Sequence, residues 1–132
     1  MSLFTALYSI LAADSAVAGL AGTRIYRITL PQETEFPAVT MNGISGNPWP
    51  LNSSRTSPLE GTVVQFSCRG ETNSTSINLA RKIAECLHGY SGTAEDIKIG
   101  AAIVQSSPDA GTIYDSETGL YVTPLDVLVR YS

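Results

Sequence analysis

Side chains able to do covalent chemistry are few in this sequence. His88 is its single histidine, so a triad with a histidine base could only be built around this residue. His88 precedes Gly89 at the expected end of a helix, where a partly cationic side chain suits the negative end of the helix dipole. The five aspartates lie far apart, and no HExxH, GxSxG, GxGxxG or phosphate-binding Walker pattern occurs. The sequence therefore predicts no catalytic residues and no enzyme activity.

Groups that could hold a metal ion or a cofactor are equally sparse. Asp115 and Glu117 are close enough in sequence to bind a cation, although carboxylates in a polar turn are more commonly just hydrated. Cys68 and Cys86 have no neighbours at the spacing of a zinc site. We expect both to be small buried hydrophobic residues, since a disulfide would need an oxidising compartment. The sequence predicts no metal and no cofactor.

The composition is that of one globular domain with a weakly charged surface. The chain has 132 residues, of which 43% are hydrophobic and 15% charged, against roughly 25% charged residues in an average domain. The net charge is −4 and the Lys and Arg residues are scattered, which argues against a protein that grips duplex DNA without sequence preference. A surface rich in Ser, Thr and Asn is found at subunit interfaces and also in ordinary loops.

Residues 60–90 hold the clearest secondary-structure pattern. Residues 60–70 alternate, with Val64 and Phe66 on one side, which predicts a half-buried strand. The next apolar residues recur at helical spacing and predict an amphipathic helix. Its buried stripe is expected to consist of Ile77, Ala80, Ile83, Ala84 and Leu87. The polar run at residues 72–76 can cap the start of this helix, and Gly89 can end it in a left-handed conformation.

The first 22 residues are apolar but fit neither a signal peptide nor a membrane span. No Lys or Arg precedes Arg24, and Asp14 interrupts the run, so the uncharged stretch is too short to cross a bilayer. We expect a short helix here, followed by a second short turn capped by Asp14.

Further strands are predicted at residues 24–30, 38–45, 97–107, 112–114 and 121–131. Gly43 is expected to mark a bulge or a close approach of backbone. One face of residues 97–107 is expected to carry Ile97, Ile99, Ala101 and Ile103. Hairpin-length connections favour an antiparallel sheet. We therefore expect one α+β domain over residues 1–132, a two-layer fold in which a mainly antiparallel sheet of about four strands has the main helix and a short N-terminal helix on one face.

The loop at residues 46–59 and the uncovered face of the sheet are the candidate binding surfaces. The loop is long for a compact domain and holds the only tryptophan, Trp49. Trp49 could fold back over the edge of the core, or it could anchor a partner, since Trp, Tyr and Arg dominate interface hot spots. The uncovered face is expected to be half apolar, which suits pairing with another copy. The candidate interface residues are Trp49, Leu51, Arg55, Arg69, Tyr114 and Arg130.

Four segments, in order along nearly the whole chain, resemble one known family. They are residues 7–26, LYSILAADSAVAGLAGTRIY; residues 30–42, LPQETEFPAVTMN; residues 63–89, VVQFSCRGETNSTSINLARKIAECLHG; and residues 115–132, DSETGLYVTPLDVLVRYS. Their succession resembles the tail terminator proteins, also called tail completion or tail-to-head joining proteins, of long-tailed bacteriophages and prophages. Residues 46–59 depart from the family, in which many members have a shorter loop.

The resemblance implies a structural protein of the virion with no catalytic residues. Such proteins form a ring, usually of six copies, at the head-proximal end of the tail tube, where the ring stops tube polymerisation and offers a surface to the head connector. The implied partners are further copies of this chain, the tail tube protein and the head connector protein. The implied location is the virion tail, assembled in the host bacterial cytoplasm. DNA would pass nearby without tight binding, in keeping with the acidic balance, and no membrane partner is implied.

Two alternatives remain open at this point. The chain could be another neck or head-closure component, which would bind the head connector and not the tail tube. It could instead be a small hydrolase or ligand-binding domain with a pocket under residues 46–59, near Trp49.

The interface hypothesis for Trp49 predicts a selective loss. Trp49→Ala should weaken self-association by about tenfold or more, the effect of truncating an interface hot spot, and should leave the fold intact. Sedimentation across a concentration series and circular dichroism measure the two effects. Unfolding of the monomer by this substitution would place Trp49 in the core.

Overall fold

The computed structural model describes residues 3–22, 24–31, 34–46, 60–107 and 111–131. In these residues the chain forms three α-helices and seven β-strands. In chain order they are α1 (Leu3–Ala13), α2 (Ser15–Ala21), β1 (Ile25–Arg27), β2 (Ala38–Gly46), β3 (Glu60–Gly70), α3 (Asn73–Leu87), β4 (Gly92–Ala94), β5 (Ile97–Val104), β6 (Ile113–Asp115) and β7 (Leu120–Tyr131). The predicted α+β class is confirmed.

All seven strands belong to one sheet, in the order β1-β2-β3-β7-β5-β4 with β6 also paired to β7. Neighbours are antiparallel except for β1 and β2, which are parallel. The long pair at the centre is β3 and β7, matched from Glu60 opposite Tyr131 to Gly70 opposite Tyr121. The outer side of β7 is shared, because β6 pairs with its beginning and β5 with its end.

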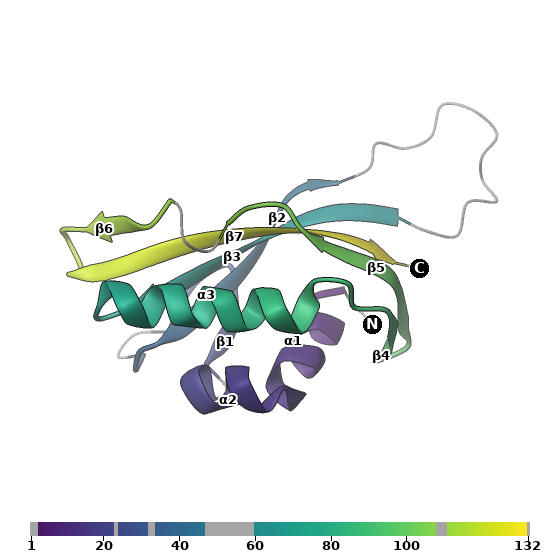
Figure 1. Ribbon diagram of the computed structural model, residues 1–132, viewed down its shortest axis with the longest axis horizontal. Coiled ribbons are helices and arrows are strands. Elements are labelled where there is room, and N and C mark those ends of the chain that lie inside the picture. Colours follow the sequence, from purple (N-terminus) through teal and green to yellow (C-terminus); the bar gives the residue numbers. More distant parts are fainter. Residues whose placement is uncertain (1–2, 23, 32–33, 47–59, 108–110, 132) are drawn as a thin grey trace.

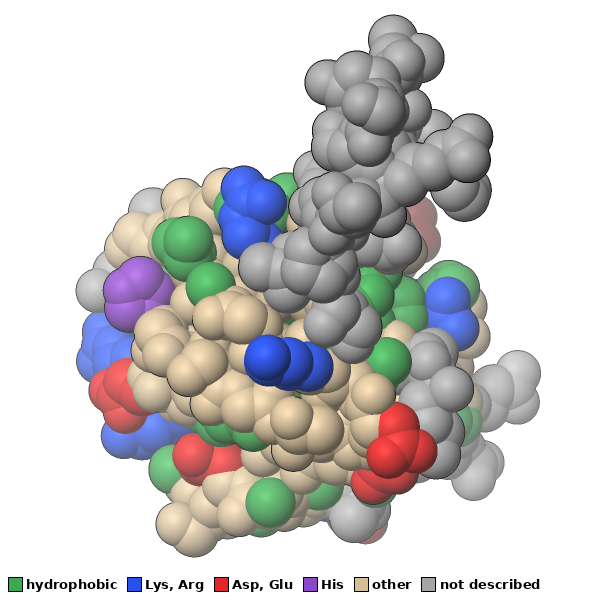
Figure 2. All heavy atoms as spheres, turned by 90° about the vertical axis from the view of Figure 1, so that its right-hand side faces the viewer, with side chains coloured by type: hydrophobic (Ala, Val, Ile, Leu, Met, Phe, Trp, Pro, Cys, Tyr) green, Lys and Arg blue, Asp and Glu red, His purple; other side chains and the backbone are tan. Residues whose placement is uncertain are grey.

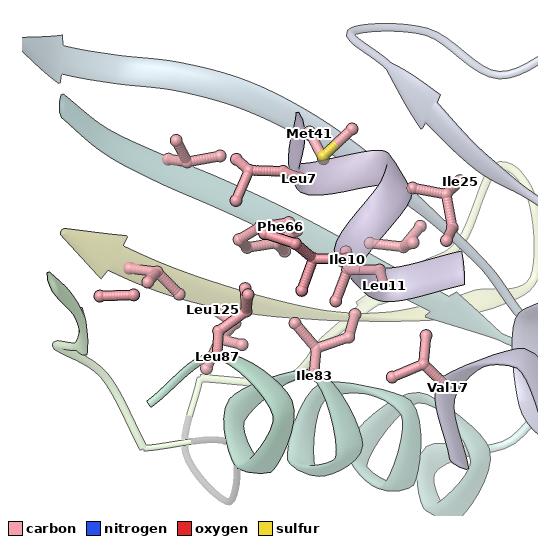
Figure 3. Packing of buried hydrophobic residues seen from close by; sticks show 14 of the residues in the cluster. Leu7, Ile10, Leu11, Val17, Ile25, Met41, Phe66, Ile83, Leu87 and Leu125 are labelled. Atoms are coloured by element: carbon pink, nitrogen blue, oxygen red, sulfur yellow. The ribbon is translucent and has the colours of Figure 1, made fainter. Parts of the chain in front are cut away.

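The helices form a second layer on one face of this sheet. Figure 1 shows α3 lying along the sheet, with α1 and α2 on the same side. Apolar side chains from α1 and α3 converge on the central strands (Figure 3). The largest fully buried side chains include Leu7, Leu11, Phe66, Leu79, Ile83, Leu87 and Leu125. Burying this apolar face is what fixes the helices to the sheet.

The caps expected from the sequence are present. The hydroxyl oxygen of Thr72 accepts a hydrogen bond from the N–H of Thr75 at 3.1 Å and so begins α3. The carboxylate of Asp14 accepts from the N–H groups of Ala16 and Val17 at 2.9 and 3.1 Å and begins α2. Gly89, just after α3, has a φ of 79°, the left-handed conformation expected there.

Three expectations are wrong in detail. The sheet has seven strands and not about four, because three-residue strands such as β4 are too short to show an alternating pattern. Ala101 and Ile103 do not share a face with Ile99, because a register shift between Ile99 and Ala101 reverses the alternation. Ala102 is consequently buried, and Ile103 is 44% exposed.

The expected bulge at Gly43 is confirmed by a register shift between Gly43 and Ser45.

The third correction concerns the stripe of α3. The fully buried residues of this helix are Ser76, Leu79, Ala80, Ile83 and Leu87, whereas Ile77 and Ala84 are half-buried. The buried stripe of α3 therefore contains Ser76 and Leu79 in place of Ile77 and Ala84.

Within the described residues, no one helix has both the length and the apolar composition of a membrane span. The pair α1 and α2, bent by 93° at their junction, meets these criteria only when taken together.

A matched pair of glycine substitutions tests the junction of β3 with α3. A Cβ added at Gly70 would lie 2.9 Å from the backbone nitrogen of Ser76, so Gly70→Ala should destabilise the fold by about 1–3 kcal/mol. Gly19 in α2 has open space around it, so Gly19→Ala should stabilise the helix by up to ~1 kcal/mol. Urea denaturation measures both, and a Gly70→Ala protein as stable as the parent would refute the close approach.

Candidate protein-interaction surfaces

The structure describes three of the six interface residues predicted from the sequence. Arg69 is on β3, Tyr114 on β6 and Arg130 on β7. The other three lie outside the described residues: Trp49, Leu51 and Arg55. In the sheet register, Arg69 and Tyr114 lie opposite neighbouring residues at the beginning of β7, whereas Arg130 lies near the end of that strand, so the three do not form one compact cluster.

The face of the sheet turned away from the helices is here called the open face. It carries the alternate residues of β3 and β7, namely Val63, Gln65, Ser67, Arg69, Pro124, Asp126, Leu128 and Arg130. Its centre is polar and internally bonded. The amide nitrogen of Gln65 donates to the Asp126 carboxylate at 3.2 Å, and the Arg69 guanidinium donates to the Thr40 hydroxyl at 2.8 Å. Arg69 is thus half-buried and already occupied in holding β2 against β3.

One end of the open face is apolar. Leu128 lies between Val63 on β3 and Ile103 on β5 in the sheet register. Ile103 is 44% exposed, and Val63 and Leu128 are half-buried. The exposed Arg130 stands in the next row, opposite Gly61 and Ala101. This row is the part of the open face best suited to contact with an apolar partner.

Charged side chains are thinly spread over the surface. Figure 2 shows separate Lys, Arg, Asp and Glu side chains on a mostly uncharged side of the molecule. No basic patch is visible there, in keeping with the net charge of −4. A duplex nucleic acid would find no continuous positive track on this side.

The hairpin of β6 with β7 carries two of the four large hydrophobic residues that are exposed in the described part of the chain. Ile113 is 62% exposed and Tyr114 is 55% exposed. The Tyr114 ring packs against the ring of Tyr121, its partner across the strands, with centroids 5.0 Å apart. Tyr114 therefore sits on the surface, as an interface residue must, and its contact with a partner stays a prediction.

The carboxylates in this hairpin shape its turn. The Asp115 side chain accepts a hydrogen bond from the N–H of Glu117 at 3.0 Å, and the Asp115 carbonyl accepts from the N–H of Gly119 at 2.7 Å. Within the described residues no group of three or more His, Cys, Asp or Glu side chains is placed to hold a metal ion. The arrangement supports a polar turn in place of a cation site.

A shallow hollow lies on the open face between β5 and β6. It has a volume of about 210 Å³ and is lined by Gln65, Ser106, Ser107, Gly111, Pro124 and Asp126. Its one carboxylate, on Asp126, already accepts a hydrogen bond from Gln65. No histidine or cysteine is among the described residues that line it. This hollow gives no support to a hydrolase.

The histidine and the two cysteines lie in surroundings that suit a structural role and not a catalytic one. The Nδ1 atom of His88 accepts a hydrogen bond from the N–H of Val104 at 3.1 Å, which ties the end of α3 to β5. Both cysteines are free. Complete burial raises the pKa of the Cys68 thiol far above its usual range, and burial together with the nearby Asp14 carboxylate raises the pKa of Cys86 to about 12. Neither thiol is an activated nucleophile.

Comparison with known proteins decides the family. Residues 5–132 match the family described as tail completion protein gp17. This chain belongs to that family. The match covers nearly the whole length, and the resemblance inferred from the four sequence segments is confirmed. Tail completion proteins are structural components of phage tails, so the broad function is a structural one in the tail.

The fold of this tail completion family member also occurs in a solved assembly. A chain of the virion of a native gene transfer agent particle matches with a TM-score of 0.75 at 18% identity, covering 98% of this chain and 94% of that chain. At this identity the likeness concerns the fold. No curated protein sequence matches the chain.

Sequence reasoning missed three exposed isoleucines, Ile28, Ile103 and Ile113. The alternating pattern predicts that Ile103 shares a face with Ile99, because the bulge in β5 leaves no mark in the hydrophobic pattern. Ile28 and Ile113 belong to edge segments of only a few residues, in which an apolar side chain is as compatible with burial as with exposure. Only the three-dimensional register reveals that these residues face outward.

The surroundings of Cys86 predict a selective change in thiol reactivity. At pH 8 neither thiol of the native tail completion protein should react quickly with a disulfide reagent, because the thiolate is the reactive form. Asp14→Asn should lower the pKa of Cys86 and speed its modification several-fold, because a nearby negative charge is lost while the cap of α2 is retained. Cys68 is the internal control. Equal acceleration of both thiols would indicate general loosening.

Proposed function

We propose that this protein forms a ring that caps the head-proximal end of the phage tail tube, ends tube polymerisation and joins the tail to the head. The observation that carries the proposal is the match of residues 5–132 to the tail completion family. The ring is proposed to contain six copies, to be assembled in the bacterial cytoplasm and to remain in the virion tail.

The distribution of exposed groups supports a role in assembly. A ring member must present two different surfaces to its two neighbours, and a terminator must also present surfaces to the tube and to the connector. The described surface offers an apolar row on the open face and exposed apolar side chains at the edges of the sheet. With 15% charged residues in the chain, little charge has to be desolvated when such surfaces are covered.

The predicted interface residues divide between these roles. Tyr114 lies at an edge, which suits contact with a neighbouring copy, and Arg130 borders the apolar row of the open face. Trp49, Leu51 and Arg55 belong to the long loop at residues 46–59 and are proposed to contact a neighbouring protein. The acidic balance of the chain suits a passage through which DNA moves without being held.

The proposal predicts control of tube length. When the cognate tail tube protein polymerises in vitro, added protein should shorten the tubes and be found at one end of each tube. Negative-stain imaging with a gold-labelled tag measures both effects. Phe66→Asp, which places a charge in the centre of the core, should unfold the chain and abolish capping.

Other results would redirect the assignment. Binding to the head connector, with no effect on tube length and no binding to tubes, would select a different neck component. Tubes of unchanged length together with no binding to either partner would refute the structural role in the tail neck.

A further inference from the structure

We infer that neighbouring copies of this chain contact one another through opposite edges of their sheets. The β1 edge, defined by Arg27 and Ile28, would meet the β6 edge of the next copy, defined by Ile113, Tyr114 and Glu117. This inference rests on the proposed function in one respect, since the ring would be closed through this contact. Its chemistry is that of an apolar contact flanked by an ion pair.

The exposed apolar side chains are distributed between the two opposite edges of the sheet. The large hydrophobic residues that the structure describes as exposed are Ile28, Ile103, Ile113 and Tyr114. The last three lie on β5 and β6, which pair with the same side of β7, whereas Ile28 follows β1 at the opposite end of the strand order. Each side of the sheet therefore presents apolar surface that a second copy could cover.

The backbone at Ile28 holds its side chain outward at a conformational cost. Ile28 has a φ of 71°, a region that β-branched residues rarely adopt, and its side chain is 59% exposed. The N–H of Ile28 donates to the Met41 carbonyl at 2.9 Å, and the N–H of Thr29 donates to the Arg27 carbonyl at 2.8 Å, which closes a three-residue turn around Ile28. An exposed isoleucine gains nothing in the isolated chain from this strained geometry, and a covering partner would offset the cost.

The two edges carry opposite charge. No Lys or Arg occurs between Lys98 and Arg130, and the β6 edge has Glu117 beside it in the turn. At the other edge, Arg27 is exposed and lies over the Phe4 ring, 4.3 Å from its centroid. This complementarity favours a contact between unlike edges and disfavours a contact between like ones.

Two other charged residues close to the β1 edge in sequence, Arg24 and Glu35, limit the charge complementarity to a small area. The Arg24 guanidinium donates to the carbonyls of Leu20 and Pro37 at 3.1 and 3.0 Å, so Arg27 is the more available cation of the β1 edge. Glu35, an exposed residue in the connection to β2, is the described acidic residue nearest to Arg27 in sequence. The attraction is therefore local to the Arg27 and Glu117 positions.

The topology gives this contact its direction. Because the two edges are different surfaces, their association is head to tail, and such a contact can close into a ring when its rotation is suitable. Both β1 and β6 are three residues long. The contact is therefore carried mainly by side chains, with the Tyr114 ring braced by Tyr121 as its aromatic anchor.

Disulfide trapping tests the pairing of the two edges directly. In a Cys86→Ser background, with Cys68 buried, Ile28→Cys and Ile113→Cys are made in separate full-length proteins. Mild oxidation of the mixture should produce a cross-linked dimer containing one chain of each kind, and each protein alone should remain uncross-linked. Dimers formed by either protein alone would show a symmetric contact and overturn the inference. So would a mixture that yields no cross-link at the highest attainable concentration.

Charge reversal gives a second, independent measurement. Arg27→Glu and Glu117→Lys should each weaken self-association by about tenfold, and the double variant should restore it because every contact then has the opposite polarity. Glu117 is substituted and Asp115 is left unchanged, because the Asp115 side chain accepts a hydrogen bond that shapes the turn. Lys82→Glu and Glu85→Lys, on the exposed side of α3, are the matched controls and should have no effect. A double variant as weak as the single ones would contradict the pairing.

Ile28→Gly tests whether Ile28 acts in the contact between copies or only in the fold of the single chain. Glycine adopts positive φ without strain, so this variant should melt at a temperature equal to or above that of the parent while its self-association falls. Unchanged association would refute the role of Ile28. Failure of these tests with normal capping of tubes would leave the proposed function standing on another interface, and success without capping would leave the contact standing without that function.

Discussion

The pairing of β3 with β7 is the interaction on which the rest of this structure depends. It runs from Glu60 opposite Tyr131 to Gly70 opposite Tyr121 without a register shift. A slip of one residue would exchange the two faces of a strand and expose Phe66 or Leu125, so the register is strongly specified by the core. The helix α3 covers this pair on its apolar face, and β2 and β5 extend it on either side.

The same alternation that fills the core also determines which surfaces remain for partners. The polar side chains opposite the core are bonded to one another across the strands, as between Gln65 and Asp126. Groups satisfied in this way gain little from a partner. The apolar side chains that remain exposed lie at one end of the open face and along the margins of the sheet. The proposed contact between copies of this chain uses these margins.

The sequence predicted those parts of the fold in which a period extends over many residues. The strand at residues 60–70, the helix that follows it and the long C-terminal strand were found from alternation and helical spacing, and Asp14 and Thr72 act as the expected caps. The short strand β4 and the bulge in β5 were missed because each depends on pairing with a distant segment. Of the candidate interface residues, Tyr114 is exposed, whereas Arg69 bonds to Thr40 within the chain, a contact that only the register between β2 and β3 creates.

The lengths of the edge strands also bear on aggregation. The strands β1, β4 and β6 are each three residues long, so the edges offer short templates for main-chain hydrogen bonding. Uncontrolled addition of further strands, the route to fibrillar aggregates, needs a longer and flatter edge than these. At β1, β4 and β6 the fold therefore exposes apolar side chains beside only a short length of strand backbone.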